Sequence, residues 1–298
     1  MSKSKNERRF QIGVNIALII ISLIMIIPLI LLISASFTGN AEIVKYGYSF
    51  IPRKVSLEGY AYIWTEKAQI FWAYGITLLV TAAGTLIAMT ITFMYGYAIS
   101  RPDYPGKKFL SFILFFTMLF NGGLVPTYIW YTRYLHIKNT LAGLIVPNLM
   151  FSAFNVILVR SYIQTNIPNA LVESAKIDGA SEMTIFRKVV MPMAKPIVAT
   201  IGLFVALAYW NDWMNGLYYI TDSKLYSVQQ LLNNMIRNVQ FLSENASSMA
   251  STSNLMASIP QETVRMAIAV VGILPILALF PFIQKYFVKG ITAGAVKG

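Results

Sequence analysis

The chain has 298 residues, of which 56% are hydrophobic and 12% are charged, and its mean hydropathy is +0.60. Soluble domains carry about 25% charged residues, so this composition indicates a protein that lies in a bilayer. The net charge of +12 does not indicate a nucleic-acid partner, because the basic residues flank apolar runs and form no single basic face.

Several kinds of chemistry are excluded by residues that the sequence lacks. It has no cysteine, which excludes disulfides and thiol catalysis, and its one histidine, His136, leaves little for a transition-metal site. It has no G-x-x-x-x-G-K-[ST] run and therefore no phosphate-binding loop of its own. We expect no catalytic residue, no metal and no cofactor in this chain. If ATP drives it, another subunit binds the ATP.

Six apolar segments are long enough to cross a membrane, because a hydrocarbon core of about 30 Å needs about 20 apolar residues. We expect helices, since backbone polar groups in lipid must be paired within their own segment. The first segment follows a basic N-terminus, as in a signal peptide, but it is longer than an h-region of about 7–15 residues, and we interpret it as a retained span. The sequence therefore predicts an all-α integral membrane protein with six transmembrane helices, at residues 12–36, 73–99, 109–131, 140–161, 196–219 and 264–287.

The distribution of basic residues predicts the orientation. Of the 24 Lys and Arg residues, 15 lie at one set of ends, and positively charged ends stay in the cytoplasm. Both termini then face the cytoplasm of a multi-pass bacterial plasma-membrane protein. The cytoplasmic parts are residues 1–11, the 100–108 loop, 162–195 and 288–298, and two long external loops are 37–72 and 220–263. Loops of this length are usually functional or disordered, so these two either meet an external partner or are partly ordered connectors.

A polar hairpin stands between the fourth and fifth apolar segments. Gly179 follows a run of good helix formers, at a position where a left-handed residue is needed, and Ser181 can cap a second short helix. The physical pattern leaves two interpretations open. The hairpin is either a docking surface for a cytoplasmic partner, or an amphipathic element that lies on the membrane or on the protein's own helices.

The spacing of residues in this hairpin resembles the EAA motif of ABC-importer permeases. Glu173-Ser174-Ala175 is followed by three residues, Gly179, nine residues and Val189-Val190-Met191-Pro192, with modest departures at Ser174, Val189 and Met191. Phe120–Thr127 and the tail from Gln284 are similar to the sugar-importer branch, in particular to its maltose-type second permease and the subgroup for polysaccharide-derived oligosaccharides. The resemblance covers most of residues 71–298 and implies an ABC transmembrane type-1 domain over 71–287 with the type I ABC importer permease fold.

The resemblance also implies partners and a role for the hairpin. A second, different permease would complete a heterodimer, two ABC ATPase subunits would bind ATP and Mg²⁺, and an extracellular solute-binding protein would deliver an oligosaccharide. The 220–263 loop would reach into that binding protein. Apart from membrane lipid, no other partner is implied. The ATPase-coupling residues would be Glu173, Ser174, Ala175, Asp178, Gly179, Ala180, Ser181, Phe186 and Pro192.

Polar and aromatic side chains within the spans are candidates for the translocation pathway. Intramembrane polar residues are costly and often functional, and sugars are bound by aromatic stacking and by amide side chains. We expect Asn148 and Asn155 to share one face of the fourth span, two helical turns apart. The alternative is that tryptophans form an interfacial belt and asparagines join helices. The candidates are Asn148, Asn155, Trp210, Asn211, Trp213 and Asn215.

Other functions fit the sequence less well. A non-sugar solute is disfavoured only by the resemblance of the tail and of Phe120–Thr127. An autonomous secondary transporter would usually show buried ionisable residues and repeated halves, and neither is evident. A membrane-embedded enzyme would need converging catalytic groups, for which one histidine in an outside loop is poor material.

Overall fold

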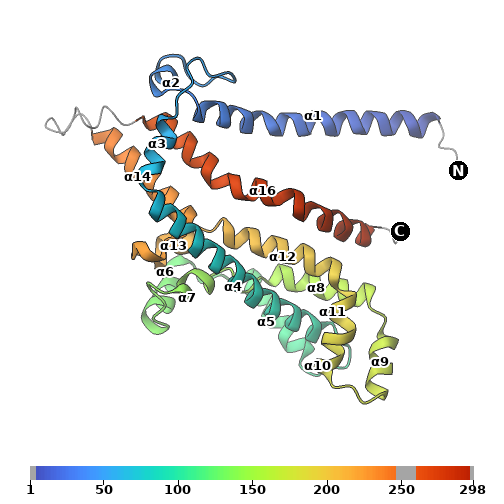
Figure 1. Cartoon of the computed structure of the whole chain (residues 1–298). Helices are drawn as coiled ribbons and strands as arrows, with labels where there is room; N and C mark the ends of the chain where they lie inside the picture. Colours follow the sequence, from blue (N-terminus) through green and yellow to red (C-terminus); the bar gives the residue numbers. More distant parts are fainter. Residues whose placement is uncertain (1–4, 246–259, 296–298) are drawn as a thin grey trace. The chain divides into compact units, whose positions relative to one another are not determined.

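A computed structural model of the chain describes residues 5–245 and 260–295 (Figure 1). Every regular element in this part of the chain is helical, and its one β-type contact is an isolated bridge between Thr38 and Val55. The chain forms two compact units, which are described separately. One contains residues 1–69 with 232–275, and the other contains residues 70–231 with 276–298.

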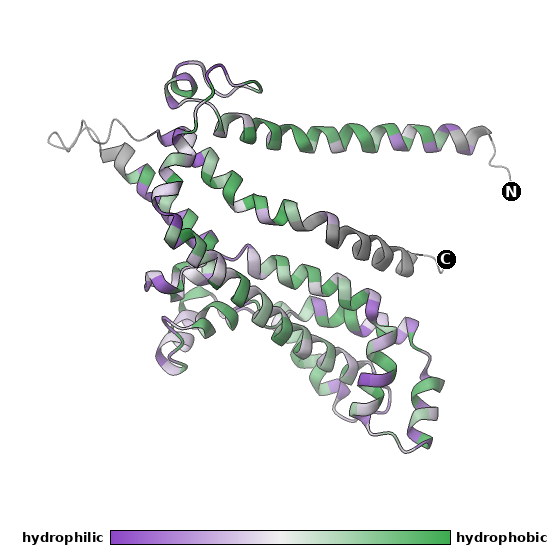
Figure 2. Ribbon diagram, in the orientation of Figure 1, coloured by the Kyte–Doolittle hydropathy of each residue, from purple (hydrophilic) through white to green (hydrophobic). Residues whose placement is uncertain are grey.

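The first unit begins with α1 (Lys5–Ser36), whose side chains from Phe10 to Ile30 are exposed. Figure 2 shows apolar residues on all sides of this helix. An apolar helix without protein cover is stable where lipid replaces water. The helix therefore has the properties of a membrane span, and its apolar part begins near the residue that the sequence predicts.

The expected external loop 37–72 is largely folded in the first unit. It contains α2 (Asn40–Tyr46) and α3 (Glu58–Thr65), and α4 (Lys67–Ser100) begins before the loop was expected to end. The loop is fixed to the start of α16 (Gln261–Ala295): Thr263 Oγ1 donates to Thr38 O at 2.8 Å, and Glu262 N donates to Asn40 Oδ1 at 3.0 Å. Polar groups at the start of α16 thus bind a segment 222 to 225 residues earlier in the sequence.

The expected loop 220–263 also contains structure. A 3₁₀ turn (Ser223–Leu225) precedes α14, an amphipathic helix over Val228–Asn245. Most of the Ser/Asn/Met-rich part of this loop, residues 246–259, lies outside the described residues.

The second unit is built around α4, which packs against α8 (Ala153–Asn166) and α12 (Lys195–Trp210). Glycine permits this close approach. A Cβ at Gly84 would lie 2.5 Å from the ring of Tyr209, and one at Gly96 would lie 2.7 Å from Val159. Small residues at helix contacts are the usual way for membrane helices to gain van der Waals contact, because lipid provides no hydrophobic drive between them.

Three helices of the described chain are long and apolar enough to cross a membrane, at Arg9–Ser36, Lys67–Ser100 and Gln261–Ala278. Two bent pairs bring the number to at most five: Lys107–Leu119 with Leu124–Tyr134, bent by 117°, and Glu182–Met193 with Lys195–Trp210, bent by 85°. The presence of six membrane spans therefore stays a prediction.

The expected span 109–131 is not one continuous helix. It is divided into α5 (Lys107–Leu119) and α6 (Leu124–Ile129), which continues as a π-helical turn, η1 (Trp130–Tyr134). Gly123 has a φ of +82°, and its N–H donates to Asn121 Oδ1 at 2.8 Å. The left-handed glycine turns the chain, while the asparagine satisfies a backbone group that the helix no longer pairs.

The expected span 140–161 is also interrupted, between α7 (Leu141–Ile145) and α8. Pro147 has no N–H to donate, and Asn148 follows with a φ of +61°. Asn148 therefore lies in the break, and it does not share a helix face with Asn155 as the sequence suggested. Asn215 Nδ2 donates to the carbonyl of Pro147 at 2.9 Å, which satisfies an acceptor at the break.

Candidate functional site

The polar hairpin folds as two short helices around a tight turn. The first helix is α9 (Asn169–Ile177), and the second consists of α10 (Glu182–Ile185), the π-helical turn η2 (Phe186–Val190) and α11 (Met191–Met193). In the turn, Gly179 has a φ of +79° and donates to Lys176 O at 3.0 Å. Ser181 Oγ accepts from Thr184 N at 3.3 Å. The glycine and serine therefore have the local geometry that the sequence predicts.

The exposed surface of the hairpin is mostly polar, with a few large apolar side chains among the polar ones: Leu171, Ile177, Met183 and Met193. Four expected coupling residues are exposed and polar: Glu173, Ser174, Asp178 and Ser181. Pro192, near the end of the second helix, is also exposed. Ile177, the last residue of α9, is 86% exposed. The sequence interpretation missed Ile177, although its place outside the stripe of Val172 and Ala175 on a helical wheel could have indicated it.

Three of the expected coupling residues point inward instead. Phe186 packs on Tyr97 of α4, with tilted rings whose centroids are 5.3 Å apart. Ala175 and Ala180 are half-buried against the core of the second unit. These residues hold the hairpin against the core of the second unit, so Phe186 is not presented outward, and the most exposed apolar side chain of the hairpin is Ile177.

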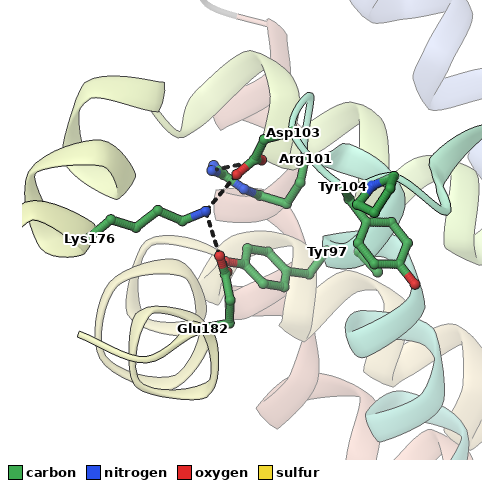
Figure 3. A pocket seen from close by; sticks show the side chains of 8 residues that line it. Tyr97, Arg101, Asp103, Tyr104, Lys176 and Glu182 are labelled. Carbon is green, nitrogen blue, oxygen red and sulfur yellow. Dashed lines mark hydrogen bonds and ion pairs between the residues drawn. The ribbon is translucent and has the colours of Figure 1, made fainter. Parts of the chain in front are cut away.

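A cluster of charged residues, called here the Lys176 cluster, joins the hairpin to the end of α4 (Figure 3). Lys176 Nζ lies 2.5 Å from Asp103 Oδ2 and 2.6 Å from Glu182 Oε1. Tyr97 donates its hydroxyl to Glu182 Oε2 at 2.6 Å, and Arg101 Nη2 lies 3.1 Å from Asp103 Oδ1. The hairpin contributes the lysine and one carboxylate, and α4 with the loop after it contributes the rest. Both oxygens of Glu182 therefore bind groups within the chain.

The groups of the cluster stabilise one another's charged forms. The hydrogen bond from Lys176 lowers the pKa of Asp103 below its usual value. The hydrogen bonds from Lys176 and then from Tyr97 lower the pKa of Glu182. The bonds to Asp103 and Glu182 raise the pKa of Lys176. All three groups are therefore charged at neutral pH. Beside them is a cavity of about 400 Å³ lined by Tyr97, Ala98, Arg101, Asp103, Tyr104, Pro105, Lys176 and Glu182.

The pathway candidates have different surroundings. Trp210 is buried and packs on Tyr74 with ring centroids 6.3 Å apart, and Asn215 is buried with its amide bonded to Pro147 O. Asn211 is exposed and donates to Leu207 O at 2.9 Å. Trp213 and Asn148 are exposed and Asn155 is half-buried. Trp210 and Asn215 therefore contribute to packing, while Trp213 and Asn148 present free surface.

No group of three or more His, Cys, Asp or Glu residues that could hold a metal ion occurs in the part of the chain that the structure describes. The hairpin surface and the Lys176 cluster can bind a partner and hold a position, and they do not form a catalytic arrangement.

The long apolar helices and the polar hairpin are typical of a membrane permease. Residues 108–293 match the family model for the binding-protein-dependent transport system inner membrane component. The chain is 37% identical to the polygalacturonan/rhamnogalacturonan transport system permease protein YtcP of Bacillus subtilis strain 168, over 98% of this chain and 99% of the relative. It is also 33% identical to Protein LplC of the same strain, over 100% of this chain and 98% of that protein. The chain belongs to the family of binding-protein-dependent transport system inner membrane components.

A solved structure supports the same assignment. The fold matches, with a TM-score of 0.78 and 30% identity, a chain in the crystal structure of a bacterial ABC transporter involved in the import of the acidic polysaccharide alginate. The match covers 96% of this chain and 99% of that chain. The fold is thus the all-α type I ABC importer permease fold that the resemblance implies.

The turn at Gly179 gives a first prediction. Valine at this position must adopt a left-handed conformation, which costs roughly 1–2 kcal/mol for an L-residue, although nothing lies within 4 Å of the added Cβ. Gly179→Val should therefore reduce hydrogen-exchange protection across the turn. Gly179→Asn should cost less, because asparagine tolerates this conformation. Equal protection in the glycine, asparagine and valine proteins would contradict the strain argument.

The Lys176 cluster gives a prediction about pH. The lowered pKa values of Asp103 and Glu182 mean that their contribution to stability is present above about pH 4 and is lost as pH falls through their folded values. The raised pKa of Lys176 means that its contribution is present below about pH 10 and is lost as pH rises through its folded value. Arg101, Tyr97 and Tyr104 also face the cluster.

The difference in melting temperature between the wild type and Lys176→Met, measured in detergent, should therefore be constant between about pH 5 and pH 9 and should shrink on either side. Because these side chains are partly exposed, the stabilisation should be small, about 1 kcal/mol or less for each pair. A difference that grows in acid would contradict the assignment of these pairs.

Proposed function

We propose that this chain is the permease subunit of an ATP-driven importer that takes up an oligosaccharide derived from an acidic polysaccharide. The observation that carries the proposal is the exposed surface of the hairpin, where Ile177, its most exposed apolar residue, lies beside the exposed carboxylates of Glu173 and Asp178. The family and the importer fold supply the context. A second permease completes the pathway, and ATP and Mg²⁺ bind in two separate ATPase subunits.

The hairpin docks in a cleft of an ATPase subunit in this proposal. Ile177 enters an apolar part of the cleft, while Glu173 and Asp178 face basic groups around it. An exposed isoleucine beside charged groups is unfavourable in water and becomes favourable when a partner covers it. The coupling residues that the sequence suggests therefore divide into an outer set, which contacts the ATPase, and Phe186, Ala175 and Ala180, which hold the hairpin in place.

The orientation follows from this docking. ATP is a cytoplasmic substrate, so the hairpin and both termini face the cytoplasm, as the distribution of basic residues predicts. The 37–72 and 220–263 segments then face outward, where a solute-binding protein delivers the sugar. The folded state of residues 38–65 fits a surface with a defined shape for such a protein.

The substrate class rests on two relatives. One is a permease for polygalacturonan and rhamnogalacturonan, and the other belongs to a transporter involved in the import of the acidic polysaccharide alginate. We assign Trp213 and Asn148 to contacts with the sugar, because they are exposed and offer an aromatic face and an amide. Trp210 and Asn215 support the pathway wall from behind.

Ile177 provides a test of the docking. Ile177→Ser should weaken binding of the purified ATPase to the permease in nanodiscs roughly tenfold or more, since burial of an isoleucine side chain contributes about 1.5–3 kcal/mol. The matched control is Ile51→Ser, which changes an isoleucine that is 80% exposed on the expected external side. Binding that is unchanged by Ile177→Ser, or weakened equally by both, would refute the docking surface.

The substrate class is tested by transport. The permease pair, the ATPase and the binding protein are placed in proteoliposomes, and uptake of trigalacturonate is compared with uptake of maltotriose. Faster ATP-dependent uptake of trigalacturonate is expected. Preferential uptake of maltotriose would overturn the acidic substrate and keep the importer. ATP-dependent uptake of neither sugar, but of a peptide, would overturn the sugar class as well.

A further inference from the structure

We propose that Lys176 is a positioning residue that makes α4 move together with the hairpin. The inference rests on the proposed function, because the hairpin must be moved by an ATPase for such a link to matter. It goes beyond docking, since every bond involved lies between groups of this chain. The Lys176 cluster would instead carry the displacement of the hairpin to a membrane-spanning helix.

The hairpin needs such a link because non-helical residues separate both ends of α9 from the neighbouring helices. Pro168 stands before it with an extended backbone, and Gly179 stands after it in the left-handed region. Its own core contact is made by Val172 and by the half-buried Ala175. Apolar contacts of this kind are not directional. The two short bonds from Lys176 define a direction for α9 that these contacts alone do not.

Both bonds of Lys176 lead to the same helix. The first reaches Asp103, three residues after the last residue of α4, and Arg101 holds the other oxygen of that carboxylate. The second reaches Glu182, whose other oxygen accepts the hydroxyl of Tyr97 in the last turn of α4. Arg101 and Tyr97 are both only 8% exposed, so the packing around them fixes these two side chains. Each carboxylate therefore connects Lys176 on one side to a rigid residue on the other.

The energetics favour a positional role over a stabilising one. Ion pairs at exposed sites contribute little to stability, because water screens them and long side chains lose entropy. Lys176 links the two helices of the hairpin to Asp103, which lies 73 residues before it in the sequence. The bonds are short and involve both oxygens of each carboxylate, which fixes geometry even where the net energy is small.

The experiment compares the fully assembled transporter with variants at Lys176. The measured quantity is sugar imported per ATP hydrolysed in proteoliposomes. Lys176→Met should lower this ratio at least roughly fivefold, the lower end of a typical coupling effect, while ATP hydrolysis continues. Lys176→Arg should restore most of it, because arginine also bridges two carboxylates. The control is Lys108→Met, an exposed lysine close to the same loop.

A reversible bridge separates positioning from folding. The chain has no cysteine, so Asp103→Cys with Lys176→Cys can be joined by a short bis-methanethiosulfonate reagent and released again with dithiothreitol. The same protein is then measured with and without the link. Import per ATP should be high when bridged and should fall when the bridge is reduced.

The outcomes distinguish the two levels of inference. If the wild type imports sugar with ATP and Lys176→Met does so at the same ratio, or if the bridge changes nothing, the positioning role is wrong and the importer stands. If the wild-type assembly shows no ATP-dependent uptake of any solute, the proposed function itself fails. A ratio that falls equally in Lys108→Met would also overturn the specific role of Lys176.

Discussion

Backbone groups that lie in lipid must find partners within the protein, and this constraint shapes the second unit of the molecule. Unbroken helices such as α4 meet the constraint by themselves. Broken segments need side chains to take over. Asn121 accepts from Gly123 at the first break, Asn215 donates to Pro147 at the second, and Tyr209 donates to Ile145 O at 2.8 Å nearby. The asparagines and the tyrosine thus pair backbone groups at the places where the helices are broken.

Because some polar side chains bind these backbone groups, not every polar residue in the spans is free to contact a sugar. In the sequence, Asn148, Asn155 and Asn215 are equally good candidates for sugar contacts, because each is an amide in an apolar segment. In the structure, Asn215 is occupied by a carbonyl group and Asn148 is exposed at a break. The distinction depends on which backbone acceptors are left unpaired, and that depends on where the helices stop.

The sequence predicts the local features of the hairpin well. Gly179 and Ser181 have a mechanism that acts within four residues, so their roles as turn and cap are visible in the sequence. The Lys176 cluster is not visible, because Asp103 lies 73 residues before Lys176 and nothing in the spacing pairs them. The exposure of Ile177 is harder to predict from the sequence for a related reason. A helix is apolar on the side that faces its own core, and the packing of Val172 shows which side of α9 this is.

The long spans are predicted for the same local reason, as hydrophobicity over 20 residues is a property of the segment alone. The helix breaks at 120–123 and 146–152 are less evident, although Gly123 and Pro147 are present, because proline and glycine are also tolerated within intact membrane helices. The sequence therefore identifies the fold class and the family motif, while the choice between inward and outward residues requires the structure.

The length of α4 has a mechanical consequence. Its 34 residues rise about 51 Å at 1.5 Å per residue, whereas the hydrocarbon core is about 30 Å thick. The helix contains no proline and therefore no built-in joint. A rod longer than the layer that it crosses must tilt or project beyond it. In the coupling proposed above, the hairpin moves the cytoplasmic end of α4, and the length of the helix carries that movement across the membrane.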